Sequence, residues 1–276
     1  MRTDVLVTAD ELAAALADDE PPVVLDVRWA LGRGRDEAHE RYLAGHVPGA
    51  VYVDLETELA APPEPLAGRH PLPAVDDLEA AARRWGVREG ASVVVYDDVE
   101  NTSAARAWWL LRWAGVASVR LLDGGLAAWT AAGRSLEAGE IMAEPGDLVV
   151  RPGAMPSATG DDVAAWPGTV LDARAAERYA GLVEPVDPQA GHIPGAVNAP
   201  TWGNLGGDGR FLPDEALRER FAGLTGPVAV YCGSGVTAAH EVAALAAIGV
   251  EAVLYPGSWS AWSNDPARPV ATGDRP

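Results

Sequence analysis

The chain has 276 residues and 48% hydrophobic composition, enough for one large domain or two of ordinary size. Its 21 basic residues stand against 40 acidic ones, and the net charge of −19 argues against nucleic acid or an anionic membrane as a partner. The sequence has no lysine, so any site for an anion must use arginine, backbone N–H groups or helix ends.

The sequence contains a single cysteine, Cys232, and five histidines. One thiol excludes an internal disulfide and a thiolate metal cluster, and no histidines are paired at metal-ligand spacing. We therefore expect no metal and no cofactor. The N-terminal segment does not have the charged-then-apolar pattern of a signal sequence, and no span of about 18 apolar residues occurs. We expect a cytoplasmic protein with no membrane partner.

The first half of the chain alternates strand and helix patterns. Thr8 and Glu11 fit a capping box ahead of a short helix. Apolar runs rich in β-branched residues predict buried strands at 23–28, 51–53, 92–97 and 119–122, with helices at about 74–85 and 104–114. A Gly-Gly-Leu-Ala-Ala-Trp segment at 124–129 closes this half.

The second half repeats this order. The strand at 169–174 corresponds to 23–28, Gly-His-Ile-Pro-Gly-Ala at 191–196 corresponds to Gly-His-Val-Pro-Gly-Ala at 45–50, and Gly-Ser-Trp at 257–259 corresponds to the first closure. Such a repeat predicts an α/β fold of two tandem domains, each a mostly parallel sheet flanked by helices. We place the domains at residues 1–140 and 158–276, with a linker at 141–157.

Cys232 follows the predicted strand at 228–231 and precedes a helix that begins near Thr237. Unpaired N–H groups at a helix start, together with the flexible Gly233 and Gly235, can surround an anion or a negatively charged sulfur. A lone cysteine is often only a small buried hydrophobic residue, but such a residue does not require two flanking glycines. We therefore interpret the loop as a nucleophile site.

The first half has Asp97 where the second half has Cys232, followed by acidic residues and no glycine. We expect the N-terminal domain to have kept the fold without the chemistry. Because His46 and His192 recur in both halves, we expect them to be structural, and we expect Asp26 and Asp172 to anchor local hydrogen bonds.

The paired Gly-His-Ile/Val-Pro-Gly-Ala motifs, the Asp-Gly-Gly and Gly-Ser-Trp closures and the single Cys loop resemble the tandem-domain sulfurtransferases of the rhodanese superfamily. The resemblance covers nearly the whole chain. The loop Cys-Gly-Ser-Gly-Val-Thr-Ala at 232–238 is most similar to the branch that uses 3-mercaptopyruvate, whereas the thiosulfate branch typically has basic residues after the cysteine.

The resemblance implies a small anionic sulfur donor, a persulfide on Cys232, and a thiol, cyanide or thioredoxin-like protein as acceptor. In this interpretation, 3-mercaptopyruvate is the favoured donor and thiosulfate is the alternative. The loop residues Gly233, Ser234, Gly235, Val236 and Thr237 would bind the donor.

Further positions follow from the resemblance. Arg178 matches an arginine that binds the mercaptopyruvate carboxylate, and His70 matches a position near the active cleft. Glu56 stands where this branch usually has aspartate. A second arginine is expected in a Glu-Pro-Arg segment, but the chain has Val186 there, which leaves the donor open.

Two other classes of function share part of this pattern. A cysteine-based phosphatase or arsenate reductase also places its cysteine between strand and helix, but it needs an arginine six residues later, where this chain has Ala238. A non-enzymatic persulfide carrier or docking module would share every motif. Turnover with small donors separates the enzyme from the carrier.

Overall fold

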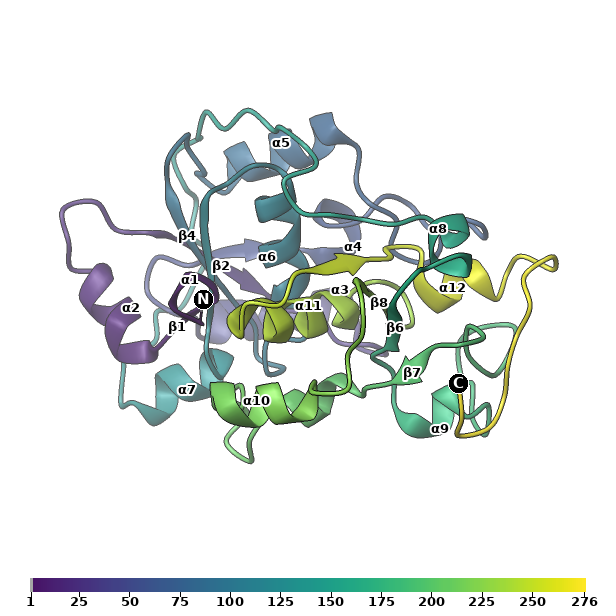
Figure 1. Ribbon diagram of the computed structural model, residues 1–276. Coiled ribbons are helices and arrows are strands. Elements are labelled where there is room, and N and C mark those ends of the chain that lie inside the picture. Colours follow the sequence, from purple (N-terminus) through teal and green to yellow (C-terminus); the bar gives the residue numbers. More distant parts are fainter. Residues whose placement is uncertain (1) are drawn as a thin grey trace. The chain divides into compact units, whose positions relative to one another are not determined.

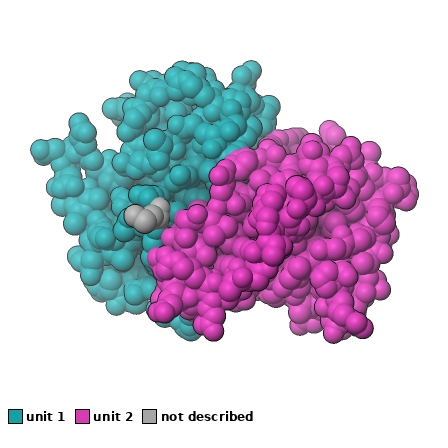
Figure 2. Space-filling model, viewed as in Figure 1, with its two compact units in different colours: residues 1–59, 73–155, 206–211 teal, residues 60–72, 156–205, 212–276 magenta. Residues whose placement is uncertain are grey.

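The computed structural model describes residues 2–276, which form two compact units (Figure 2). Unit 1 contains the described residues up to 59, together with 73–155 and 206–211. Unit 2 contains residues 60–72, 156–205 and 212–276. The division predicted from the sequence, with a linker at 141–157, treats each half as continuous and stays a prediction.

Unit 1 is built on a sheet of five parallel strands in the order β1-β5-β4-β2-β3 (Figure 1). The strands are β1 (Leu6–Val7), β2 (Val23–Val27), β3 (Val51–Val53), β4 (Ser92–Tyr96) and β5 (Ser118–Leu122). The helices are α1 (Arg2–Val5), α2 (Ala9–Ala15), α3 (Arg35–Ala44), α4 (Leu55–Glu58), α5 (Val75–Arg84), α6 (Ala104–Trp113) and α7 (Gly125–Ala131). The predicted strands and long helices are confirmed, and the capping box at Thr8 and Glu11 starts α2. The short strand β1 and the helices α1, α3, α4 and α7 were not predicted.

Unit 2 has four parallel strands in the order β7-β6-β8-β9. These are β6 (Thr169–Asp172), β7 (Val197–Asn198), β8 (Val228–Tyr231) and β9 (Ala252–Leu254). The helices are α8 (Gly160–Ala164), α9 (Ala176–Tyr179), the 3-10 helix η1 (Thr201–Asn204), α10 (Asp214–Arg220), α11 (Thr237–Ala247) and α12 (Ser258–Trp262). Both units therefore have the predicted α/β architecture with parallel sheets.

The core of unit 2 places β8 between two apolar layers. Tyr231 and Ala229 pack in one cluster with Trp259 and Trp262 of α12 and with Tyr179 of α9. On unit 2, α11 contacts β8 and β9, and almost all of its residues are buried. Burying each large aromatic side chain stabilises the unit by roughly 2–3 kcal/mol. The strand that leads to Cys232 is therefore fixed at its carboxyl end.

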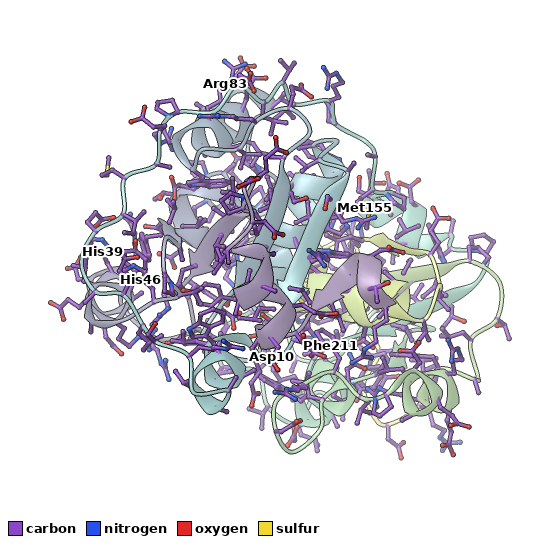
Figure 3. All side chains as sticks on the ribbon, turned by 90° about the vertical axis from the view of Figure 1, so that its left-hand side faces the viewer. Asp10, His39, His46, Arg83, Met155 and Phe211 are labelled. Atoms are coloured by element: carbon purple, nitrogen blue, oxygen red, sulfur yellow. The ribbon has the colours of Figure 1, made fainter. Side chains whose placement is uncertain are left out.

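Each unit includes a short segment from the other half of the sequence. In unit 2, Gly68 approaches the turn before α12 so closely that a Cβ would lie 2.7 Å from the Gly257 carbonyl oxygen. In unit 1, the Phe211 N–H donates to Asp123 (2.9 Å), and Arg2 donates to the Phe211 carbonyl oxygen (2.9 Å). Phe211 is labelled in Figure 3. The segment 60–72 thus belongs to the same unit as Cys232.

The same buried ion pair stands at the end of β2 and of β6. Arg28 donates to the Asp26 carboxylate (2.7 Å) and to the Gly45 carbonyl oxygen (2.8 Å). Arg174 donates in the same way to Asp172 (2.7 Å) and to the Gly191 carbonyl oxygen (2.7 Å). The two aspartates therefore anchor local hydrogen bonds, as expected from the sequence.

The repeated histidines occupy equivalent buried places in the two units. His46 stacks on Tyr42, with ring centroids 4.3 Å apart, and its Nδ1 lies 3.0 Å from the Tyr42 carbonyl oxygen. His192 stacks on Tyr179 at 3.8 Å, with Nδ1 2.8 Å from the Tyr179 carbonyl oxygen. Figure 3 shows His46 on the same side of unit 1 as His39. An identical packing in both units fits the structural role predicted for these histidines.

Residues 2–276 contain neither a candidate membrane-spanning helix nor a candidate metal-binding cluster. None of the helices there is long and apolar enough to cross a membrane. The same residues contain no group of three or more histidine, cysteine, aspartate or glutamate side chains that could hold a metal ion.

Glu241 is a fully buried acid on α11. Its carboxylate accepts a hydrogen bond from Asn204 of η1 at 2.6 Å. Burial raises the pKa of Glu241 to about 7, although Asn204 and the charge of Arg220 partly offset that effect. The folded protein therefore binds this proton more tightly than the unfolded chain does.

We predict that unit 2 loses stability as the pH rises from about 4.5 to about 7, because the unfolded chain releases the Glu241 proton first. Glu241→Gln keeps an oxygen for Asn204 and carries no charge, so the melting temperature of this variant should depend less on pH across that interval. Thermal unfolding between pH 5 and 8 measures the difference, with the exposed Glu251→Gln as control. Parallel pH profiles for Glu241→Gln and the parent protein would contradict the prediction.

Candidate active site

Cys232 lies at the carboxyl end of β8, one loop before α11. It is a free cysteine with 1% of its surface exposed. The Gly235 N–H donates to its sulfur at 3.1 Å. The sulfur therefore sits within its own loop, close to the positive end of an 11-residue helix. The thiolate is the reactive form of cysteine, and both the N–H group and the helix end favour negative charge at this place.

Gly235 is the residue that lets the loop close on the sulfur. Its φ of +79° is a conformation that L-residues other than glycine rarely adopt. A Cβ at this position would lie 2.4 Å from the Pro256 carbonyl oxygen. The predicted tight loop is thus pressed against the segment that precedes α12, and Pro256 contributes its backbone to that contact.

The start of α12 holds the Cys232 loop through backbone hydrogen bonds. The Cys232 N–H donates to Ser258 Oγ (3.1 Å), and the Cys232 carbonyl oxygen accepts from the Trp259 N–H (3.0 Å). The Ser260 N–H donates to the Gly233 carbonyl oxygen (2.9 Å). Ser258, the first residue of α12, has a φ of 52°, a left-handed conformation that is uncommon outside glycine. The loop is fixed on both sides of the Cys232 sulfur.

The segment 60–72 brings two further side chains to the loop. The Arg69 N–H donates to Ser260 Oγ at 3.1 Å. The next residue, His70, is buried, and its Nδ1 lies 2.8 Å from Ser234 Oγ. His70, which the resemblance placed near the active cleft, therefore contacts a residue of the Cys232 loop.

Arg178 on α9 is held by two carboxylates. It donates to Glu184 at 2.6 Å and to Asp187 at 3.2 Å. Its Nη1 would lie 3.4 Å from a Cβ on Gly233, so the guanidinium lies beside the Cys232 loop. Burial acts to raise the pKa of Glu184, but Arg178 and backbone N–H groups outweigh burial and leave that pKa lowered. Glu184 is thus stabilised as the charged partner of Arg178.

The remaining residues predicted for the site are divided between the units. Val236 and Thr237 form the junction between the loop and α11, and Val236 is buried. Val186 is 40% exposed, and its N–H donates to Glu184 at 3.1 Å. Glu56 belongs to unit 1, where its carboxylate accepts a hydrogen bond from the Trp29 indole at 3.2 Å.

The corresponding loop of unit 1 is filled by its own carboxylate. Asp97 accepts hydrogen bonds from the N–H groups of Val99, Asn101, Ser103 and Ala104 at 2.7–2.9 Å. Burial raises the pKa of Asp97 to about 6, although these four N–H groups act to lower it. The backbone donors that would surround an external anion are thus already satisfied.

The structure brings three residues to the site that the sequence did not single out. Ser258 anchors the Cys232 N–H, Asp187 pairs with Arg178, and Arg69 pairs with Asp187. The closure motif pointed to the region of Ser258 without assigning it a partner. Arg69 precedes His70, but no spacing links it to a loop that lies more than 160 residues later.

The comparisons with known proteins agree on one family. The model of the rhodanese-like domain matches residues 8–132 and 158–265. A Mycobacterium tuberculosis protein with the provisional name thiosulfate sulfurtransferase SseB is 49% identical over 99% of this chain and 98% of its own length. A Pseudomonas aeruginosa protein with the provisional name 3-mercaptopyruvate sulfurtransferase is 49% identical over 98% of both chains. The crystal structure of SseA from Escherichia coli, presented as a rhodanese fold, matches with a TM-score of 0.80 and 35% identity, covering 92% of this chain and 98% of that one.

We predict that Gly235→Ala lowers turnover at least tenfold and also lowers the melting temperature, since a Cβ there meets the Pro256 carbonyl oxygen. Gly249→Ala is the matched control, because Gly249 has nearly the same φ, +81°, with open space around it. The control should cost only about 1 kcal/mol and leave turnover unchanged. Steady-state kinetics and thermal unfolding of both variants test this, and equal effects on turnover would refute it.

Proposed function

This chain belongs to the rhodanese family and is a sulfurtransferase, and we propose that Cys232 carries the transferred sulfur as a persulfide from a small anionic donor to an acceptor. The observation that carries the proposal is the position of the Cys232 sulfur, at the end of β8 and within hydrogen-bond distance of the Gly235 N–H. The same donor can hold negative charge on the thiolate and on the persulfide.

With 3-mercaptopyruvate as donor, the Cys232 thiolate attacks the donor sulfur, which keeps its proton. An S–S bond forms as the C–S bond breaks, and the electron pair stays on carbon, so pyruvate leaves as its enolate and takes up one proton. An acceptor thiolate then attacks the outer sulfur, the bond to Cys232 breaks, and the cysteine thiolate returns. The acceptor leaves as a persulfide, and cyanide would leave as thiocyanate by the same displacement.

We favour 3-mercaptopyruvate over thiosulfate as donor. The loop after Cys232 has no charged side chain, and Arg178 offers Nη1 beside Gly233 for a carboxylate. We assign to Ser234, with His70 behind it, the binding of the donor carbonyl oxygen, because a hydroxyl held by an imidazole can donate to an oxygen on which negative charge develops. Thiosulfate remains the second candidate, since the two relatives at 49% identity are named for different donors.

We further propose that unit 1 takes no part in the chemistry, because Asp97 fills its loop with a bound carboxylate. The acceptor is proposed to be a thiol, cyanide or a thioredoxin-like protein. A stable persulfide carrier is the non-enzymatic alternative. The cytoplasmic location expected from the sequence stays a prediction.

We predict turnover with 3-mercaptopyruvate and a thiol acceptor that Cys232→Ala abolishes, because no other thiol is present. Pyruvate release measures the reaction, and a parallel assay with thiosulfate and cyanide compares the donors. Mass spectrometry should show one extra sulfur atom on Cys232 after donor is added without acceptor. A rate several-fold higher with thiosulfate would reverse the donor assignment, and a persulfide with no turnover on either donor would favour the carrier.

Arg178→Ala should raise KM for 3-mercaptopyruvate roughly ten- to hundredfold, the loss expected when a charge-assisted hydrogen bond of about 1.5–3 kcal/mol is removed. The effect on thiosulfate should be smaller. Arg268→Ala is a suitable control, because Arg268 is also a partly buried arginine of unit 2 and pairs with Asp161 rather than with the loop. Equal increases in KM for both donors would contradict a role in binding the carboxylate.

A further inference from the structure

Unit 2 has a cavity of about 340 Å³ that is separate from the Cys232 loop. The described residues that line it come from the start of α8, the end of β9, α12 and the segment 66–67, and none of them lies in the loop 232–236. The Pro256 carbonyl oxygen faces the loop at Gly235, whereas the next residue, Gly257, lines the cavity. A volume of this size is typical of sites for small molecules.

The Tyr255 hydroxyl faces this cavity without a hydrogen-bond partner among residues 2–276. Tyr255 is only 6% exposed. Its hydroxyl oxygen would lie 3.1 Å from a Cβ on Gly160 and 3.2 Å from a Cβ on Gly257. Because neither glycine has a side chain, the space in front of the hydroxyl stays open. A buried polar group that the protein leaves unpaired can be satisfied by an atom of a ligand.

The hydroxyl of Tyr255 is a donor at neutral pH. Burial raises the pKa of Tyr255 to about 12, although the positive charge of Arg268 acts to lower it. Tyr255 therefore keeps its proton, which it can share with an acceptor such as a carbonyl oxygen.

The charged side chains around the cavity are already paired with one another. Arg268 Nη2 donates to Asp161 at 2.5 Å, and its Nη1 donates to the Gly160 carbonyl oxygen at 3.2 Å. Its Nε lies 3.4 Å from Asp265 Oδ2, and its guanidinium stacks 4.9 Å from the centre of the Trp262 ring. Two carboxylates thus surround one cation, so an anionic ligand would gain little from Arg268. The charges favour a ligand with no net charge.

The tyrosine is held in place by its backbone. The Tyr255 N–H donates to the Val230 carbonyl oxygen at 2.9 Å, and the Tyr255 carbonyl oxygen accepts from Ser258 Oγ at 2.9 Å. Ser258 Oγ in turn accepts the Cys232 N–H. The hydroxyl is therefore positioned by contacts that exist without a ligand, and a preformed site loses less free energy when it binds.

We propose that this cavity is a second small-molecule site, which takes an uncharged compound whose carbonyl oxygen accepts a hydrogen bond from Tyr255. The apolar part of the compound would pack against Ala67 and Ala261 and cover Leu66, which is 70% exposed. The inference goes beyond sulfur transfer and does not depend on the proposed function.

The test titrates the full chain with 4-fluorobenzamide, which has a carbonyl oxygen, an apolar ring and no net charge, and follows its binding by fluorine NMR. We expect saturable binding with a Kd in the low millimolar range, as for other fragments of this size. The anion 4-fluorobenzoate should bind about fivefold more weakly or worse, because Asp161 and Asp265 already neutralise Arg268. No saturable binding of the amide, or equal affinity for the anion, would overturn the assignment.

Two variants locate the bound probe. Tyr255→Phe removes a hydroxyl that has no partner among residues 2–276, so the melting temperature should stay the same or rise while affinity for the probe falls about fivefold or more. Gly160→Ala places its Cβ 3.1 Å from the hydroxyl and should weaken binding to a similar extent. Gly223→Ala is the matched control, because Gly223 also belongs to unit 2 and has open space around it. Unchanged affinity in Tyr255→Phe, or a lower melting temperature, would refute the role of the hydroxyl.

Cys232→Ala separates this cavity from the candidate active site. The variant should bind the probe as tightly as the parent protein does, and excess 3-mercaptopyruvate should not displace the probe from the parent. Loss of binding in Cys232→Ala, or displacement by the donor, would place the probe in the Cys232 loop and overturn the proposal. Since this comparison measures binding alone, its outcome is independent of whether the parent protein turns over either donor.

Discussion

The backbone contact between the Cys232 loop and the first turn of α12 is the constraint on which the site depends. Three hydrogen bonds between the loop and residues 258–260 fix the chain on both sides of the sulfur. In the same segment, Ser260 Oγ accepts a hydrogen bond from the Arg69 N–H, and the Gly257 carbonyl oxygen leaves no room for a side chain at Gly68. Cys232 and Arg69 are therefore positioned by one short piece of chain.

Both units have this contact between the loop and the following helix, although only unit 2 has a cysteine in the loop. In unit 1, the Leu126 N–H donates to the Asp97 carbonyl oxygen at 2.9 Å, as the Trp259 N–H does to that of Cys232. Gly125 has a φ of 58° where Ser258 has 52°. The units differ in the residue that follows the strand. In unit 1 the Asp97 carboxylate accepts hydrogen bonds from several N–H groups of its loop, whereas in unit 2 the Cys232 sulfur accepts one, from Gly235.

The sequence predicts the strands and the main helices well, because the patterns that indicate them are local. Continuous β-branched runs identify the parallel strands, and the capping box at Thr8 identifies the start of α2. Cys232 and its glycines follow from the same kind of pattern. Arg69 and Ser258 could not be found in this way, since their roles come from contacts between segments that no periodicity connects. The places of His70 and Arg178 were reached only through resemblance to a family.

The exchange of short segments between the units has a consequence for how this chain can be divided. A fragment that starts at the beginning of the second family match, residue 158, contains Cys232 and Arg178 but lacks His70 and Arg69. The two halves of the sequence repeat the same order of motifs, yet part of the site in the second half is formed by residues 60–72 of the first half. The second half expressed alone would therefore lack side chains that lie against its own Cys232 loop.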